Sequence, residues 1–183
     1  MLYAFGFEQL GVVVSDLYFV DPGPLPGQET AERGVRLELR IFEPGELTGT
    51  IYAARPISIG RPLWRVDLLQ DADAPPHTLD RAHHHPNFDG WDPGSRVFVP
   101  ELSGDPLSWL SRHLADPGGV LKEAGTSLGE ISESDRDALR AATPEIVDTV
   151  RRLLDRVWSG ELGRPTENTA ASGAATSMRV SWL

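Results

Sequence analysis

The sequence predicts an α+β fold, in which an antiparallel β-sheet meander of five or six strands is followed by C-terminal helices packed on it. Residues 1–100 hold short segments rich in β-branched and aromatic residues, separated by turns that contain Gly and Pro. Residues 105–160 hold segments that begin at Asp-Pro or Thr-Pro and repeat apolar residues at helical spacing. The links between the expected strands are short, which favours pairing between neighbours in the chain. We expect a single α+β domain over residues 1–162 and a flexible tail with an apolar end over residues 163–183.

Alternation of apolar and polar residues identifies the strands. The clearest alternation lies in residues 35–42, where apolar side chains are interleaved with Arg36, Glu38 and Arg40. We expect these three charged residues to form a solvent-exposed row along the strand. Further strands are expected over residues 10–20, 50–59, 63–69, 79–88 and 96–99, with a turn at residues 60–62.

Prolines and capping residues divide the second part of the chain into four expected helices. Asp105 and Asp116 each precede a proline, which is the pattern of an N-cap followed by Pro at the first helical position. Ser132 or Ser134 can cap the third helix. Because proline interrupts the hydrogen bonding of a helix, we expect Pro144 to begin a separate fourth helix.

The fourth helix carries the most regular apolar stripe in the sequence, over residues 146–158. Such a stripe usually packs against a core, so it predicts that Leu154 and Trp158 are buried. Gly160 is expected to end the helix, because glycine readily adopts the left-handed conformation found after helix ends.

Composition and charge exclude several classes of protein. The chain has 183 residues and no cysteine, so disulfide frameworks, cysteine zinc sites and cysteine nucleophiles are excluded. Its 17 basic and 27 acidic residues give a net charge of −10, which argues against nonspecific binding to nucleic acid or anionic membranes. The longest apolar runs are too short to span a bilayer, and the first residues lack the pattern of a signal peptide. We therefore expect a soluble, cytoplasmic protein.

One segment is rich in histidine. Four of the five histidines lie within residues 77–85. If this segment is a strand, alternate side chains share a face, so His83 and His85 point one way and His84 the other. The preceding strand alternates in the same manner, and its polar face can coincide with that of the histidines. The sequence therefore predicts a candidate site formed by Arg65, Asp67, Arg81, His83 and His85.

Two kinds of chemistry suit these residues. Imidazoles titrate near neutral pH, so His83 and His85 can act as base and acid on a phosphodiester. Arg65 and Arg81 can then stabilise charge on the phosphoryl oxygens, and Asp67 can orient an imidazole. The substrate of such a hydrolase or nuclease-like enzyme would be a small molecule or RNA. Alternatively, His83, His85 and Asp67 can ligate a divalent metal such as Zn²⁺.

Noncatalytic interpretations stay open beside these two. Neighbouring histidines are common on surface loops, where they have no special role. The chain can also be a structural domain or a module that binds a partner protein. Residues 178–183 are apolar, which suggests that they add as a strand to this sheet or to a second copy in a homodimer. A disordered chain end is the alternative for this segment.

Overall fold

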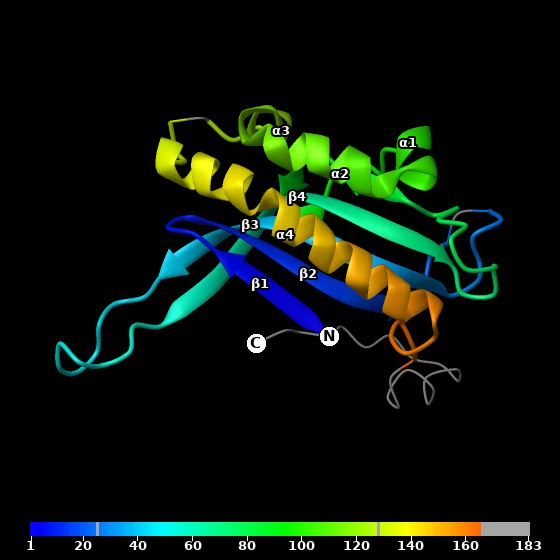
Figure 1. The fold of residues 1–183 in the computed structure, drawn as a ribbon, viewed down its shortest axis with the longest axis horizontal. Helices are drawn as coiled ribbons and strands as arrows, with labels where there is room; N and C mark the ends of the chain where they lie inside the picture. Colours follow the sequence, from blue (N-terminus) through cyan, green and yellow to red (C-terminus); the bar gives the residue numbers. More distant parts are fainter. Residues whose placement is uncertain (25, 128, 166–183) are drawn as a thin grey trace.

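The fold is described by a computed structural model, which covers residues 1–24, 26–127 and 129–165 (Figure 1). A five-stranded antiparallel sheet, in the order β1-β2-β3-β4-β5, is followed by helices, and this confirms the predicted α+β arrangement. A two-stranded ribbon, β6 and β7, lies between the sheet and the helices in the sequence. The strands are β1 (Leu2–Gly6), β2 (Leu10–Phe19), β3 (Glu32–Pro44), β4 (Ile57–Asp71), β5 (His83–His85), β6 (Phe88–Asp89) and β7 (Asp92–Pro93). The helices are α1 (Pro100–Gly104), α2 (Pro106–Ala115), α3 (Pro117–Glu123) and α4 (Glu133–Trp158).

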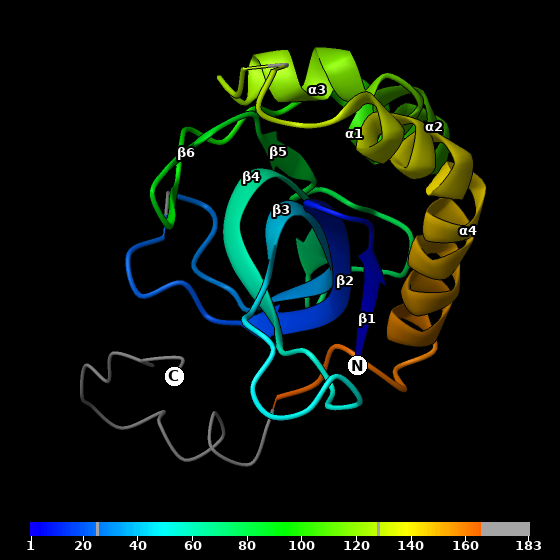
Figure 2. The same ribbon diagram turned by 90° about the vertical axis from the view of Figure 1, so that its left-hand side faces the viewer.

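The helices cover one face of a strongly curled sheet (Figure 2). The apolar residues of β2, β3 and β4 face these helices and form the core with them. Among the largest fully buried side chains are Trp64, Leu37, Leu39, Leu110 and Leu139. The opposite face of the sheet carries the polar residues of the alternating strands, so the period-two pattern of the sequence separates a packing face from a polar face.

Strand β4 is longer than expected. The predicted strand over residues 50–59 is wrong for residues 50–56, and the predicted turn at residues 60–62 is wrong, because β4 runs without interruption from Ile57 to Asp71. Pro62 pairs with Arg40, at a place where the register between β3 and β4 shifts. The regular ladder of hydrogen bonds is interrupted at such a bulge. A proline, which cannot donate a backbone hydrogen bond, is therefore tolerated there.

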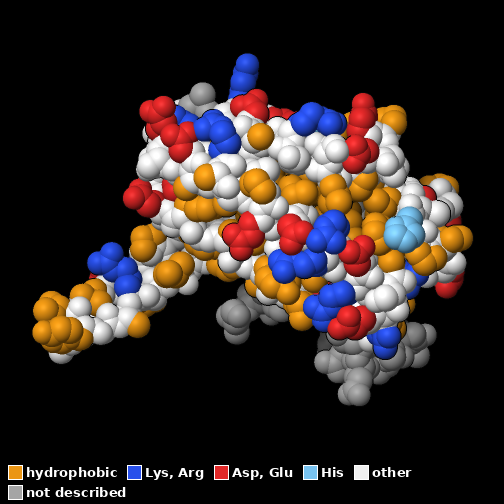
Figure 3. All heavy atoms as spheres, in the orientation of Figure 1, with side chains coloured by type: hydrophobic (Ala, Val, Ile, Leu, Met, Phe, Trp, Pro, Cys, Tyr) orange, Lys and Arg blue, Asp and Glu red, His pale blue; other side chains and the backbone are white. Residues whose placement is uncertain are grey.

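The connection between β3 and β4 projects from the sheet as an arm, defined here as residues 43–59 (Figure 1). Its outer part carries exposed apolar side chains, which gather at the end of the projection in Figure 3. Tyr52 is 90% exposed and Ile51 is 82% exposed. This arm therefore presents apolar surface well away from the polar face of the sheet.

The histidine segment is a shorter strand than predicted. Of the expected strand over residues 79–88, only His83–His85 pairs with β4. Leu79 has a left-handed backbone with φ of 44°, so the chain turns just before β5. Of the expected strand over residues 96–99, only Val97 pairs, through a single antiparallel bridge to His84.

The predicted N-caps of the first two helices are confirmed. The Asp105 side chain accepts a hydrogen bond from the Ser108 backbone N–H at the start of α2. The Asp116 side chain accepts one from the Gly119 N–H at the start of α3. These bonds satisfy backbone donors that the first turn of a helix leaves without partners. The short helix α1 precedes them and was not predicted.

The predicted break at Pro144 is wrong, because α4 continues through it from Glu133 to Trp158. Proline removes one backbone donor and crowds the carbonyl one turn earlier, which bends a helix. Figure 2 shows α4 curving around the sheet and the other helices. The Thr143 hydroxyl donates to the Leu139 carbonyl inside this region at 3.0 Å. Packing on both halves therefore outweighs the loss of one backbone hydrogen bond.

The apolar stripe of α4 faces the core as predicted, although Val147 and Trp158 are only partly buried. Leu154 is buried, whereas Trp158 is only partly buried. The Trp158 indole N–H donates to the side-chain oxygen of Gln70, so the ring lies at the edge of the core. Gly160 follows the helix with φ of 73°, as expected of a residue that ends it.

No helix in residues 1–24, 26–127 and 129–165 is long and apolar enough to cross a membrane. Most of the predicted flexible tail and all of the proposed docking segment, residues 178–183, lie outside the described residues.

Truncation of Leu154 tests the packing of α4. We expect Leu154→Ala to lower the free energy of unfolding by about 2–5 kcal/mol, because it removes a buried side chain and leaves a cavity. Chemical denaturation of the purified variant measures this change. Glu145→Ala, at an exposed position of the same helix, is the control and should change stability by about 0.5 kcal/mol or less. A loss below about 0.5 kcal/mol for Leu154→Ala would contradict the packing.

Candidate functional site

Two rows of side chains cross the polar face of the sheet. Strand register places Arg36 of β3 opposite Asp67 of β4, and Asp67 opposite His83 of β5. The bridge between His84 and Val97 continues this row to Phe98. The second row is displaced by two residues along each strand, so that it lies on the same face. It consists of Glu38, Arg65, His85 and Arg96. Opposite charges therefore alternate along and across β3 and β4, where Arg36 and Glu38 face Asp67 and Arg65.

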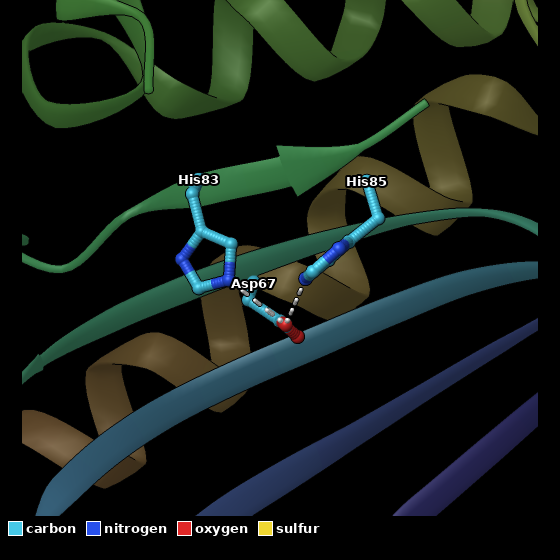
Figure 4. Close-up of side chains that lie close together, drawn as sticks. All are labelled: Asp67, His83 and His85. Atoms are coloured by element: carbon cyan, nitrogen blue, oxygen red, sulfur yellow. Dashed lines mark ion pairs between the residues drawn. The ribbon is translucent and has the colours of Figure 1, made fainter. Parts of the chain in front are cut away.

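Asp67 is the centre of this arrangement (Figure 4). Its side chain is only 1% exposed. Arg36 donates to both of its oxygens, with Nε to Oδ1 at 2.6 Å and Nη2 to Oδ2 at 3.2 Å. The Nε atom of Arg65 lies 3.1 Å from Oδ2. Burial alone would raise the pKa of Asp67, but Arg36 and Arg65 outweigh it and hold the pKa below its ordinary value. Asp67 is therefore a carboxylate.

His83 presents one particular ring nitrogen to this carboxylate. Its Nδ1 lies 2.7 Å from the carbonyl oxygen of Arg81, which can only accept, so Nδ1 carries the proton. Its Nε2 lies 3.5 Å from Asp67 Oδ2. Burial lowers the pKa of His83 despite the nearby Asp67. The neutral ring therefore directs the lone pair of Nε2 toward the carboxylate.

His85 is held in the same tautomer. Its Nδ1 donates to the Gly94 carbonyl at 2.7 Å. Its Nε2 accepts from Arg65 Nη2 at 2.9 Å and lies 3.7 Å from Asp67 Oδ2. Burial and the positive charge of Arg65 lower the pKa of His85 to about 4. Backbone carbonyls thus orient both imidazoles, and both Nε2 atoms converge on one carboxylate oxygen, as Figure 4 shows.

The predicted grouping of Arg65, Asp67, His83 and His85 is present, whereas Arg81 lies apart from it. The Arg81 guanidinium donates to the Gly27 carbonyl at 3.0 Å and pairs with Asp71 at 3.4 Å. Its place is explained by the chain direction: Arg81 precedes β5, in the turn that leads from Leu79. The part of Arg81 that serves the site is its backbone carbonyl, which holds His83.

Three charged members of the two rows, Arg36, Glu38 and Arg96, were not among the predicted site residues. The row of Arg36, Glu38 and Arg40 was expected to be solvated, but Arg36 binds Asp67, and Glu38 pairs with Arg40 at 2.6 Å and lies 3.9 Å from Arg65. The alternation of residues 35–42 could have predicted this membership, because it places these side chains on the same face of the sheet as Asp67. Arg96 was missed because the register of Val97 could not be read from the sequence.

His84 has a separate environment on the opposite face. Its ring lies 5.2 Å from the Trp109 ring and 6.2 Å from the Trp64 ring, between centroids. His113 stacks on Trp109 at 3.5 Å. Burial and then His113 lower the pKa of His84 to about 4, so this imidazole is a neutral member of the core. The three consecutive histidines therefore divide between a polar site and an apolar layer.

The segment that follows β5 borders the site. Phe98 lies 5.3 Å from the His83 ring and Phe88 lies 6.4 Å from the His85 ring, between centroids. His83 and His85 are 2% and 3% exposed, so their rings are almost completely enclosed. Two surface pockets, of about 380 and 360 Å³, are lined by other residues, around His113 and around the base of the arm at Phe42. The polar cluster is filled by its own side chains, and its exposed border is at Phe98.

The pKa values of the histidines predict how stability depends on pH. In the unfolded chain an imidazole takes up a proton near pH 6.5, whereas the pKa values of His84 and His85 in the fold are about 4. Unfolding therefore takes up protons between these values, and the free energy of unfolding should fall as the pH is lowered from about 6.5 to about 4. Glu32, whose pKa is raised by burial, acts in the opposite direction.

Urea denaturation at a series of pH values measures this dependence. Because several groups titrate, the informative quantity is the difference between the native protein and His85→Asn, which removes one titrating ring. The variant should lose stability less steeply with falling pH. Equal slopes for the two proteins would show that the fold does not lower the pKa of His85.

Comparisons with known proteins do not assign this chain to a family. The chain matches no family model, no curated protein and no solved structure. The chemical interpretation of the site therefore depends on the residues of the two rows and on their geometry.

Proposed function

We propose that this protein is a small hydrolase that cleaves phosphodiesters, with His83 and His85 as the groups that transfer protons. The observation that carries the proposal is the convergence of two neutral imidazoles on one buried carboxylate among several guanidinium groups. Perturbed histidine and carboxylate groups held together in this way are typical of catalytic sites. We place this activity in the cytoplasm, in keeping with a chain that has no cysteine to oxidise.

His83 is suited to act as the base. Its Nε2 is unprotonated at neutral pH, and its ring orientation is fixed by the Arg81 carbonyl. Because this lone pair faces Asp67 in an enclosed cluster, the attacking hydroxyl or water must enter between the ring and the carboxylate. When Nε2 accepts a proton from an attacking hydroxyl or water, the new positive charge lies 3.5 Å from Asp67 Oδ2. The carboxylate then stabilises the imidazolium that forms. The electron pair of the attacking oxygen forms the new bond to phosphorus.

His85 and the arginines are suited to the leaving group and the phosphoryl charge. A bound phosphodiester anion would favour protonation of His85, which could then donate a proton to the leaving oxygen as its bond to phosphorus breaks. Arg65 already donates to His85 Nε2 and can turn this donor to a phosphoryl oxygen. Arg96 lies in the same row as His85 and can provide a second guanidinium.

A metal-dependent hydrolase is the second candidate. One ligand atom each from Asp67, His83 and His85 lie within 4.8 Å of one another. In a tetrahedral zinc site with zinc–ligand distances of about 2.0–2.1 Å, ligand atoms lie about 3.3–3.4 Å apart. The two Nε2 to Oδ2 distances, 3.5 and 3.7 Å, are close to this value. The backbone carbonyls on both Nδ1 atoms are also the usual outer partners of zinc-bound imidazoles.

Arg65 makes the metal-free version the better supported of the two. Its guanidinium contacts Asp67 Oδ2 and His85 Nε2, which are two of the three atoms that would bind the metal. Arg36 adds a second positive charge to the same carboxylate. A divalent cation would have to displace Arg65 and lie beside both guanidiniums, and this repulsion weakens its binding.

His83→Asn tests the proposed base. We expect it to lower kcat for a phosphodiester by about 100- to 10,000-fold, the usual contribution of acid–base catalysis. The matched control is His77→Asn, because His77 is an exposed histidine with φ of 71°, a conformation that asparagine tolerates. The control should keep full activity. Full activity in His83→Asn, with its fold verified by circular dichroism, would contradict the proposal.

Zinc titration separates the two versions of the site. We expect weak zinc binding to the native protein, stronger binding by about tenfold or more to Arg65→Met, and activity that survives a chelator. Isothermal titration calorimetry at pH 7 measures both affinities. Tight zinc binding by the native protein, together with loss of activity in the chelator, would replace the metal-free version with the zinc-dependent one.

A further inference from the structure

An aromatic residue stands at the exposed border of the site. Val97 pairs with His84, so its neighbours Arg96 and Phe98 lie on the other side of the chain, on the face that carries His83 and His85. Phe98 is 48% exposed, although its ring centroid is 5.3 Å from that of His83. A large apolar ring that is half in solvent beside a buried polar site is a surface on which a flat ligand can stack.

We infer that Phe98 is a subsite for an unpaired nucleobase, so that the substrate is a phosphodiester joined to a nucleoside. This inference rests on the proposed function, and it adds the substrate class. The base stacks on the exposed side of the Phe98 ring, and the neighbouring phosphodiester reaches His83 across one sugar. Stacking between bases and aromatic side chains is a general means of binding single-stranded nucleic acid and nucleotides.

The charges around Phe98 favour this ligand. Arg96 lies two residues away on the same face, and Arg65 lies in the same row as Arg96. These guanidiniums can bind the phosphate that is attached to the stacked base. Asp21, which pairs with Arg96 at 3.2 Å, leaves the guanidinium partly exposed and able to take a second partner. The net charge of −10 argues against nonspecific binding, and the guanidiniums here already face Asp67 and Asp21, so we expect contact with one phosphate rather than attraction of a long polyanion.

A second exposed ring on the same segment lacks these features. Trp91 is 65% exposed and lies over the Arg40 guanidinium at 5.3 Å. Its sequence neighbours include Asp89 and Asp92, both exposed, whose charges repel a phosphate. Trp91 also has no ring contact with His83 or His85 among the described residues. It therefore provides a matched control for Phe98.

The test compares two chromogenic diesters that share a p-nitrophenyl leaving group. One is a thymidine 5′-(p-nitrophenyl phosphate) and the other is methyl p-nitrophenyl phosphate, which has no base. We expect Phe98→Ala to lower kcat/KM for the thymidine diester by about 5- to 150-fold, the value of one stacking contact of about 1–3 kcal/mol. Because Phe98 also packs beside His83, the informative quantity is the ratio of kcat/KM for the thymidine diester to that for the base-free diester, which should fall by this factor, and Phe98→Trp should restore the ratio.

Two control variants distinguish stacking at Phe98 from a general effect of removing a ring. Trp91→Ala and Tyr52→Ala, the latter on the distant arm, should leave the ratio of the two kcat/KM values unchanged. A short single-stranded oligonucleotide, the same sequence as a duplex, and a free dinucleotide then distinguish the sources of the base. Competition by the single strand but not the duplex would assign the subsite to a nucleic acid strand. Competition by the dinucleotide alone would assign it to a free nucleotide.

Failure of the subsite differs from failure of the proposed function. If the native protein hydrolyses both diesters equally well and Phe98→Ala changes neither, the subsite is refuted and the hydrolase stands. If it hydrolyses neither diester, the proposed function fails. Calorimetric titration with the oligonucleotide then tests the subsite separately. If a base stacks on Phe98, the Phe98→Ala variant binds the oligonucleotide less tightly than the Trp91→Ala variant does. Equal affinities would overturn the inference.

Discussion

A carboxylate with almost no contact with water is the constraint on which the polar face of this sheet depends. Removing a charge from water costs several kcal/mol, so Asp67 is stable only because guanidiniums from β3 and β4 approach it at hydrogen-bonding and ion-pairing distances. The charge of Arg65 is balanced in turn by a second carboxylate. Glu38 lies between Arg40 and Arg65 and forms ion pairs with both. The registry of β3, β4 and β5 is thereby fixed by charge on one face and by packing on the other.

The edge of the sheet determines what this charged centre can do. Strand β5 is only three residues long, and beyond it the chain pairs through one bridge at Val97. The first row therefore runs from Arg36 on the central strand β3, which is partly exposed, through the buried Asp67 and His83 to Phe98, which is half in solvent. This position places the desolvated carboxylate and imidazoles next to an exposed border, which is the arrangement that the proposed function requires.

Much of the fold could be predicted from the sequence, because its signals are local. Alternation assigned Asp67 and His83 to one face, and Asp-Pro pairs gave the starts of α2 and α3. The errors arose where tertiary structure overrides a local rule. A bulge accommodates Pro62 within β4, and packing on both halves carries α4 through Pro144. Arg36 was assigned to solvent because its partner, Asp67, lies on the neighbouring strand β4, and the register that pairs the two residues could not be read from the sequence.

The division of the three histidines between two faces has an optical consequence. His84 touches the tryptophan layer formed by Trp64 and Trp109, while its neighbours on both sides contact the polar cluster. Any ligand that shifts β5 must also move an imidazole against two indole rings, and the emission of an indole is sensitive to nearby imidazole. A displacement of β5 by a ligand at the polar cluster is therefore expected to change the intrinsic tryptophan fluorescence, so that binding can be followed without an added label.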